Sequence, residues 1–211
     1  MNKYLNRIDA GQRLGKVVAS KVTAADHTLV LALPRGGVPV GAEVAKAIGG
    51  ELDLLIVRKL GMPFDPEFAF GAISSGGACY LNPAVLARHI LSDDQINEVR
   101  EAEEAELARR EHLYRGDRKF PDLTGKTVIL VDDGIATGAS VRAALLALRN
   151  LGPGRIVLAV PVAPADAEEE FVGLVDDFIC PLLPEALGSV GQFYAVFDQV
   201  EDAQVIEARS E

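Results

Sequence analysis

Short apolar runs alternate with amphipathic stretches along most of the chain. Near-continuous apolar runs predict strands that are buried on both faces, at residues 28–33, 52–57, 128–131, 156–160 and 178–180. Between them, apolar side chains recur at helical spacing at residues 38–48, 139–151 and 166–174. This alternation predicts an α/β fold with a parallel sheet and helices on both of its faces.

Other segments lie outside this alternation. Residues 4–20 have helical spacing, and the runs 70–75 and 78–81 flank Gly76-Gly77, which is typical of a hairpin. The motif SDDQ at residues 92–95 predicts a capping box that begins a charged helix reaching about residue 114. Residues 58–68 are rich in Gly and Pro and predict an irregular segment. Neither a linker nor an internal repeat interrupts the chain, so we expect a single domain over residues 1–211.

Composition and charge narrow the class of protein. The 211 residues are 49% hydrophobic and 25% charged, which is ordinary for a globular protein. A net charge of −10 without an extended basic tract argues against a large nucleic-acid interface. The polar start and the strand-sized apolar runs argue against a leader peptide and a membrane span, so we expect a cytoplasmic protein. Cys79 and Cys180 form no CxxC motif, which excludes a cysteine-rich zinc site, and we expect both to be core residues.

The strongest chemical motif follows the strand at residues 128–131. Asp132 and Asp133 stand at the end of that strand, and a turn of small residues leads into the next helix. Backbone N–H groups, the hydroxyls of Thr137 and Ser140 and the positive helix terminus favour a phosphate monoester. The carboxylates suit sugar hydroxyls and, through them, a divalent cation. The segment therefore predicts a site for a phosphorylated sugar, and the alternative is a structural strand–helix turn.

Two further loops carry cations or glycines at strand ends. Arg35, Gly36 and Gly37 follow the first strand, where exposed N–H groups and a guanidinium suit a pyrophosphate. Arg58 and Lys59 follow the second strand. In isolation they would be a solvent-exposed pair, but beside phosphate loops in an acidic protein we favour pyrophosphate neutralisation. Because ligands of such folds bind at the carboxyl ends of the strands, we expect one shared pocket.

The segment VILVDDGIATGAS, residues 128–140, resembles the ribose-phosphate motif of type I phosphoribosyltransferases, which bind phosphoribosyl pyrophosphate. The PRGG and RKLG segments, residues 34–37 and 58–61, are similar to those of a poorly characterised bacterial branch of that family. The resemblance implies a three-layer, Rossmann-like core at about residues 28–180 with a small hairpin and lid insertion. It also implies a hood at about residues 181–200 that the N-terminal helix completes.

The same resemblance implies a Mg²⁺-dependent transfer of a 5-phosphoribosyl group to a nitrogen acceptor such as a nucleobase, with release of pyrophosphate. It also implies a homodimer. The implied residues are catalytic Arg58, Lys59, Asp132 and Asp133; ribose 5-phosphate-binding Asp132, Asp133, Gly134, Ala136, Thr137, Gly138 and Ser140; pyrophosphate-binding Arg35, Gly36, Gly37, Arg58 and Lys59; hood residues Phe193 and Tyr194; and Asp132 and Asp133 near the Mg²⁺.

The acceptor is less well defined. Phe193 and Tyr194 either present an aromatic face to the acceptor or close the core. Ala136 stands where hypoxanthine–guanine members usually carry an acid and adenine-type members carry Ala, which argues against a 6-oxopurine acceptor. Residues 61–68 resemble the mobile lid of the family, in which Asp65 and Glu67 are candidate proton donors.

Two other classes of protein share features with this sequence. A non-catalytic sensor of phosphoribosyl pyrophosphate is the main alternative, because regulators also use this fold. A receiver domain shares the ILVDD pattern, but here that pattern comes late in the chain and ATGAS follows it, which excludes this class. The three histidines have no metal-ligand spacing and receive no role: His27, His89 and His112.

Overall fold

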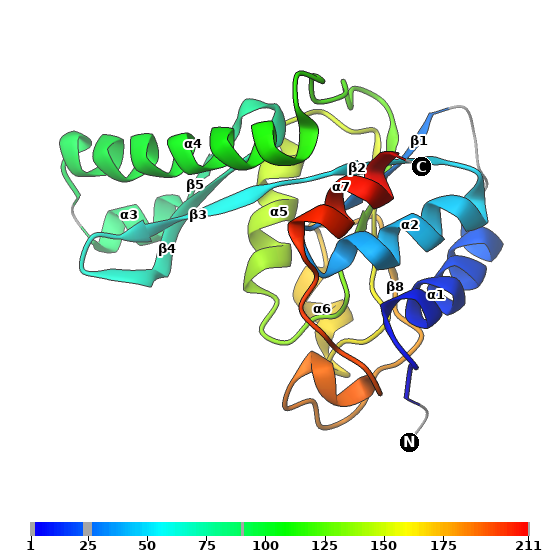
Figure 1. Cartoon of the computed structure of the whole chain (residues 1–211). Coiled ribbons are helices and arrows are strands. Elements are labelled where there is room, and N and C mark those ends of the chain that lie inside the picture. Colours follow the sequence, from blue (N-terminus) through cyan, green and yellow to red (C-terminus); the bar gives the residue numbers. More distant parts are fainter. Residues whose placement is uncertain (1–2, 23–26, 90, 211) are drawn as a thin grey trace. The chain divides into compact units, whose positions relative to one another are not determined.

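The computed structural model of the chain describes residues 3–22, 27–89 and 91–210 (Figure 1). The chain divides into two compact units, and each is described by itself. The first unit comprises Met1–Leu55, Leu123–Gly138 and Pro153–Glu211, and the second comprises Ile56–Asp122 and Ala139–Gly152. The assignment of all 211 residues to one domain stays a prediction.

The first unit contains a five-stranded sheet with the strand order β2-β1-β6-β7-β8. Every neighbouring pair in this sheet is parallel, which confirms the predicted α/β class. The elements of the unit are α1 (Arg7–Lys21), β1 (Thr28–Ala32), α2 (Gly37–Ile48), β2 (Glu51–Leu54), β6 (Thr127–Val131), β7 (Arg155–Ala159), α6 (Ala167–Phe171), β8 (Asp177–Ile179), the short 3₁₀ helix η2 (Val190–Phe193) and α7 (Asp202–Ser210).

The central strands are buried on both faces, as their near-continuous apolar runs predict. Val30 and Ile129 belong to a core that also contains apolar side chains of α1 and α2. The next residue of each strand points to the opposite face because side chains alternate along a strand. Those residues, Leu31 and Leu130, are fully buried as well. The sheet therefore presents its unpaired polar groups mainly at the strand ends, where the candidate loops begin.

The second unit contains a three-stranded antiparallel sheet with the order β3-β4-β5. Its elements are β3 (Val57–Met62), β4 (Asp65–Ser74), η1 (Ser75–Gly77), β5 (Ala78–Leu81), α3 (Pro83–Arg88), α4 (Asp93–Arg115) and α5 (Ala139–Arg149). The hairpin predicted around Gly76-Gly77 is confirmed as β4 and β5. Cys79 is exposed in β5, so the prediction that both cysteines are core residues is wrong for this one.

The irregular segment predicted at residues 58–68 is wrong, because most of it forms β3 and β4. Gly61 and Pro66 produce a register irregularity in this hairpin instead of a loop. A Cβ at Gly61 would lie 2.7 Å from the Cα of Pro66, so the close approach of the two strands requires a glycine there. The candidate proton donor Asp65 begins β4, and the side chain of the other candidate, Glu67, lies outside the described residues.

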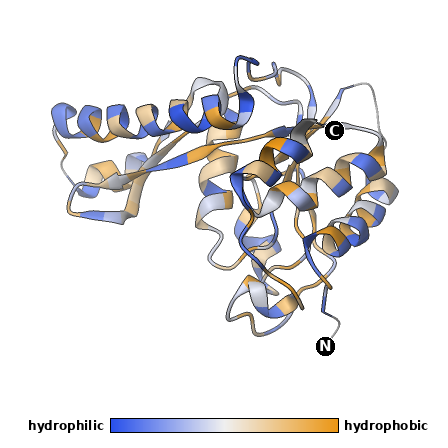
Figure 2. Ribbon diagram, viewed as in Figure 1, coloured by the Kyte–Doolittle hydropathy of each residue, from blue (hydrophilic) through white to orange (hydrophobic). Residues whose placement is uncertain are grey.

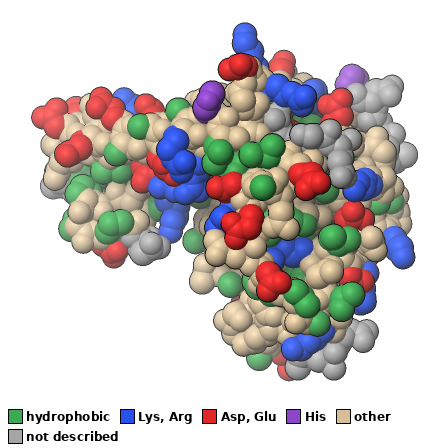
Figure 3. Space-filling model, in the orientation of Figure 1, with side chains coloured by type: hydrophobic (Ala, Val, Ile, Leu, Met, Phe, Trp, Pro, Cys, Tyr) green, Lys and Arg blue, Asp and Glu red, His purple; other side chains and the backbone are tan. Residues whose placement is uncertain are grey.

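The long helix α4 begins with the predicted capping box, in which the Ser92 hydroxyl accepts from the Gln95 N–H and the Gln95 side chain accepts from the Ser92 N–H. Figure 2 shows that most of α4 is hydrophilic, and only a few of its side chains are buried. Acidic and basic side chains are interspersed over the face that Figure 3 shows. In the described part of the chain, no helix has the length and hydrophobicity needed to cross a membrane.

Candidate functional site

The loops that follow β1 and β6 lie against each other in the first unit. The Leu33 N–H donates to the carbonyl oxygen of Val131 over 2.9 Å, so the chain leaves both strands side by side. A Cβ at Gly37 would lie 2.8 Å from that carbonyl oxygen, and a Cβ at Gly36 would collide with the carboxylate of Asp133. Two residues without side chains are therefore what allows the PRGG loop to reach the acidic pair. The structure thus brings together the predicted pyrophosphate loop and the predicted sugar site.

The acidic pair is partly buried and poorly solvated. Burial raises the pKa of Asp132 well above its usual range, and the neighbouring Asp133 carboxylate raises it further. Burial also raises the pKa of Asp133, while the guanidinium of Arg7 opposes that shift. The Asp132 side chain accepts a hydrogen bond from the Asp133 N–H over 2.8 Å. Carboxylates held in this way suit neutral hydrogen-bond donors such as sugar hydroxyls, which compensate their lost hydration.

Arg7 is a component of the site that the sequence analysis missed. Its Nε donates to Oδ2 of Asp133 over 2.8 Å, and its Nη1 donates to the carbonyl oxygen of Asp198 over 2.6 Å. The guanidinium also lies 3.8 Å from the ring centroid of Phe197. The sequence contains one indication of this role. Arg7 lies in the first turn of the predicted helix, where the helix dipole favours acidic rather than basic side chains.

Of the two predicted hood residues, Tyr194 contacts the acidic pair. The Tyr194 hydroxyl donates to the backbone carbonyl oxygen of Asp133 over 2.6 Å. Burial and the neighbouring carboxylate raise the pKa of this hydroxyl, so it stays a donor. Phe193 is 2% exposed and packs in a core cluster with Tyr4. Phe197 is 37% exposed, and the sequence analysis did not select it.

The phosphate-loop segment continues from Asp133 into α5. Gly138 has a φ of 69°, a left-handed conformation that favours glycine. The Ile135 N–H donates to the carbonyl oxygen of Val162 within the first unit, while Ala136 and Thr137 are exposed. Ser140 is exposed and belongs to the second unit, in the first turn of α5. The exposed segment around Thr137 thus stays accessible to a ligand.

Arg35 follows the cis peptide bond after Pro34 at the beginning of the pyrophosphate loop. Its Nη1 lies 3.7 Å from Oδ1 of Asp202, the first residue of α7. The Arg35 side chain is 34% exposed, so an ion pair at this distance contributes little to stability. The guanidinium is therefore in a position to exchange this carboxylate for a more highly charged anion.

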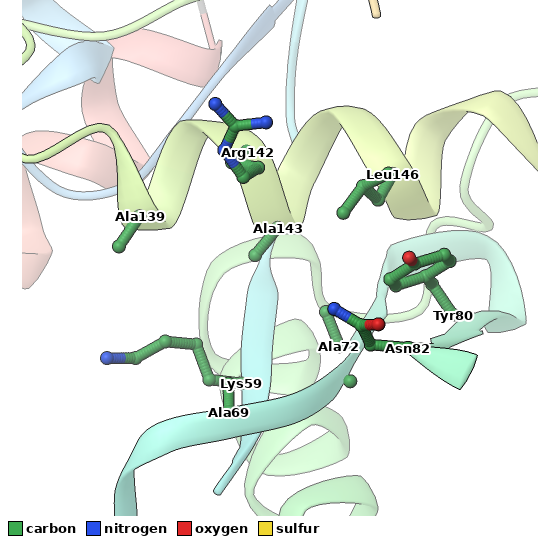
Figure 4. A pocket seen from close by; sticks show the side chains of 10 residues that line it. Lys59, Ala69, Ala72, Tyr80, Asn82, Ala139, Arg142, Ala143 and Leu146 are labelled. Atoms are coloured by element: carbon green, nitrogen blue, oxygen red, sulfur yellow. The ribbon is translucent and has the colours of Figure 1, made fainter. Parts of the chain in front are cut away.

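Arg58 and Lys59 belong to the second unit, where β3 directs them to opposite sides. The Nε of Arg58 donates to Oε2 of Glu103 in α4 over 2.6 Å. Lys59 instead lines a pocket of about 210 Å³ with small residues of α5, such as Ala143 (Figure 4). Adjacent residues of a strand cannot both face one ligand. Pyrophosphate binding by Arg58 and Lys59 stays a prediction. In this structure the side chain of Arg58 is bound to α4 instead.

Asp132 and Asp133 are the candidate ligands for a metal ion at this site. Among the described residues, no group of three or more His, Cys, Asp or Glu side chains could hold a metal ion. Two adjacent carboxylates supply hard oxygen ligands of the kind that Mg²⁺ prefers. They fit a cation that a bound ligand coordinates in part through its own oxygens, and the Mg²⁺ expected from the sequence stays a prediction.

Comparisons with known proteins bear on the family to which the chain belongs. Residues 73–181 match the model of the phosphoribosyl transferase domain. Rv0571c of Mycobacterium tuberculosis, named as a candidate phosphoribosyl transferase, is 42% identical over 206 residues, which are 98% of this chain and 46% of that protein. The chain thus spans about half the length of this relative. The bifunctional protein PyrR of Chloroflexus aurantiacus is 46% identical over 89 residues, 36% of this chain and 47% of PyrR.

Among solved structures, the crystal structure of TT1426 from Thermus thermophilus has a TM-score of 0.88 at 38% identity and covers 98% of this chain and 97% of that one. The AQ2163 protein from Aquifex aeolicus is similar in fold alone, with a TM-score of 0.51 at 10% identity and coverage of 88% and 78%. The family model covers more than half of the chain and includes the loop that carries the acidic pair. The chain therefore belongs to the type I phosphoribosyltransferase family.

Proposed function

We propose that the protein transfers a 5-phosphoribosyl group from phosphoribosyl pyrophosphate to a nitrogen acceptor and releases pyrophosphate. The observation that carries this proposal is the contact between the PRGG loop and the acidic pair, which Gly36 and Gly37 make possible. A loop rich in N–H donors beside two carboxylates suits a ligand with a pyrophosphate arm next to sugar hydroxyls. A donor sugar activated as its pyrophosphate has that composition.

Each part of the site then has a distinct role. Thr137 and its neighbouring N–H groups bind the 5-phosphate, while Asp132 and Asp133 accept hydrogen bonds from the ribose hydroxyls. Arg35 and Gly37 hold the pyrophosphate. Asp132 and Asp133 would hold a Mg²⁺ ion together with oxygens of the substrate, and that ion would supply positive charge to neutralise the leaving group. Carboxylates that bind the ribose hydroxyls would also stabilise positive charge that develops on the sugar ring.

The chemistry is a substitution at the anomeric carbon. The bond from that carbon to the pyrophosphate oxygen breaks, and a bond to the acceptor nitrogen forms. The proton lost by the acceptor passes to a base or to water. The enzyme contributes orientation and water exclusion, which reduce the competing hydrolysis of the sugar. No covalent intermediate is required, so neither Cys79 nor Cys180 takes part.

The acceptor side is assigned to the wall formed by Arg7, Tyr194 and Phe197. Phe197 presents a partly exposed ring, and Arg7 stacks on it while it holds Asp133. A flat heteroaromatic base suits such a wall because its π-face packs on an aromatic ring. Ala136, which stands where hypoxanthine–guanine members usually carry an acid, is consistent with an acceptor other than a 6-oxopurine.

The binding part of the proposal is tested by isothermal titration calorimetry with phosphoribosyl pyrophosphate and Mg²⁺. Asp133→Asn and Arg35→Ala are expected to weaken binding at least about tenfold, since each removes from the site a charged group that would form a hydrogen bond with the ligand. Asp9→Asn is the matched control, because Asp9 is paired with Arg13 on α1 and touches no part of the site. Equal losses of stability and binding in all three variants would contradict the assignment.

The catalytic part is tested by incubating the wild type with phosphoribosyl pyrophosphate, Mg²⁺ and a panel of nucleobases and small amines. Release of pyrophosphate that depends on one acceptor is the expected result. Binding of the donor without release for any acceptor would instead favour a non-catalytic sensor.

A further inference from the structure

A second cavity lies in the second unit at the C-terminal end of α4. It has a volume of about 430 Å³, which is within the range of small-molecule sites. The end of α4, the following loop and the turn between β4 and β5 line it, chiefly with Arg115, Arg118, Lys119, Glu111 and Gly77. None of the residues assigned above to phosphoribosyl pyrophosphate is among its lining residues.

The charge in this cavity is opposite to that of the whole protein. Arg115, Arg118 and Lys119 contribute three cations against one carboxylate, Glu111, while the chain carries a net charge of −10. Arg115 is only 5% exposed, and its guanidinium lies 5.0 Å from the ring centroid of Phe120. Packing against an aromatic ring holds this guanidinium in place before any ligand binds. The cavity therefore has a local field that attracts anions.

Basic residues at a helix C-terminus have an ordinary explanation, since they complement the helix dipole. That explanation covers Arg115, which lies in the last turn of α4. It does not cover Arg118 and Lys119, which lie beyond the helix and are exposed. The dipole places about half a negative charge at the helix end, which is less than the three full positive charges around the cavity.

Three glycines, Gly76, Gly77 and Gly116, also line the cavity. Gly76 has a φ of 81° and Gly77 a φ of 76°, so this turn requires residues without side chains. A Cβ at Gly76 would lie 2.7 Å from Cδ1 of Phe120, whereas a Cβ at Gly77 or Gly116 would meet no atom within 4 Å. At Gly77 the backbone of the turn is therefore open to a ligand next to the cations.

We propose that this cavity binds a phosphorylated small molecule the size of a sugar phosphate or nucleoside monophosphate. Two guanidinium groups and one ammonium match the charge and the several acceptor oxygens of a phosphate dianion. The volume leaves room for the organic part of the ligand, which inorganic phosphate alone would not fill. This inference stands on the second unit alone and does not depend on the proposed function.

The experiment is hydrogen exchange measured by mass spectrometry, which locates binding on the chain. Wild-type protein is exposed separately to inorganic pyrophosphate, ribose 5-phosphate and adenosine monophosphate. We expect slower exchange at residues 74–80 and 112–120. Arg118→Glu combined with Lys119→Glu should raise the ligand concentration needed for this protection at least about tenfold, because the double substitution changes the charge facing the ligand by four. Both side chains are exposed, so the fold should tolerate the change.

The matched control reverses one Arg and one Lys that do not line the cavity, Arg88→Glu with Lys16→Glu, and should behave like the wild type. Retained protection at residues 74–80 and 112–120 in the Arg118 and Lys119 variant would overturn the proposal. Protection only at residues 33–37 and 132–140 would overturn it while supporting the proposed function. Absence of protection at residues 74–80 and 112–120 with all three ligands would also overturn it. Protection by inorganic pyrophosphate alone would overturn it too, because that anion has no organic part, whereas a preference between ribose 5-phosphate and adenosine monophosphate identifies which organic part the cavity accepts.

Discussion

Arg7 and Arg13 provide a matched pair of perturbations on one helix. Each forms an ion pair with an aspartate, over 2.8 Å for Arg7 and 3.0 Å for Arg13, and each guanidinium lies over an aromatic ring. The side chains of the Arg7–Asp133 pair are only 12% and 15% exposed, compared with 48% and 25% for the Arg13–Asp9 pair. Replacement of either arginine by Met removes the charge and keeps most of the apolar stem.

The expected losses differ because of burial. Removal of one partner from a fully buried pair costs about 3–5 kcal/mol, so the partly solvated pair of Arg7 should cost about 2–3 kcal/mol. The exposed i,i+4 pair of Arg13 contributes only about 0.3–0.5 kcal/mol. For a chain of this length, each kcal/mol lowers Tm by roughly 2–4 °C. We therefore expect Arg7→Met to lower Tm by roughly 4–12 °C and Arg13→Met by no more than about 2 °C.

The loss in free energy of unfolding caused by Arg7→Met should also depend on pH. Burial already raises the pKa of Asp133 in the folded protein, and loss of Arg7 raises it further. A carboxyl group whose pKa is raised in the folded protein lowers the free energy of unfolding fully at higher pH. Protonation of the group reverses that loss as the pH falls through the pKa of the folded state. Relief begins at a higher pH in the variant than in the wild type, so the difference between the two should narrow from neutral pH toward the unfolded value of about 3.9.

Urea denaturation of the wild type and both variants at a series of pH values measures these free energies of unfolding. Equal losses for Arg7→Met and Arg13→Met at neutral pH would refute the reasoning, because burial would then not distinguish the two pairs. A deficit that is constant with pH would show that lost packing, rather than the carboxylate, is responsible.

Two further predictions concern the elements around the site. Gly37→Ala places a Cβ 2.8 Å from the Val131 carbonyl oxygen and 2.9 Å from the Asp132 Cα, so we expect a loss of about 1–3 kcal/mol in urea denaturation and a larger loss of phosphoribosyl pyrophosphate affinity in calorimetry. Unchanged binding would show that the PRGG loop has no contact with the ligand. Ser92→Ala removes the cap of α4 and should lower the free energy of unfolding by about 1 kcal/mol. Helicity and the affinity of the first unit's loops for phosphoribosyl pyrophosphate should stay unchanged. A large loss of that affinity would contradict a purely structural role for this cap.

The parallel core and the position of two of its loops could be predicted from the sequence. Strands such as β6 are buried on both faces, and a continuous apolar run in the sequence predicts such a strand directly. Once parallel strands are recognised, topology alone places the residues that follow β1 and β6 at one edge of the sheet. The contact between Gly36 and Asp133 follows from this rule and did not require a residue-level pattern.

The rest of the site could not be predicted because it depends on contacts between distant segments. Arg7 and Asp133 are 126 residues apart, and no helical or strand periodicity encodes such a pair. The error at residues 58–68 has a different cause, since Gly61 and Pro66 are typical of loops but here permit a close strand approach. Recognition of β3 as a strand would have shown that Arg58 and Lys59 point to opposite sides.

The hydrogen bonds that join the segment at Tyr4 to the segment at Phe193 affect how the protein acquires its site during translation. The Tyr4 N–H donates to the Phe193 carbonyl oxygen, and the Ala195 N–H donates to the Tyr4 carbonyl oxygen, each over 2.8 Å. These segments are 189 positions apart, so a ribosome needs roughly 10–40 s to make the second after the first. A nascent chain that already carries both aspartates still lacks Tyr194 beside them, so the hydrogen bond from the Tyr194 hydroxyl to the Asp133 carbonyl oxygen forms only after nearly the whole chain has been made.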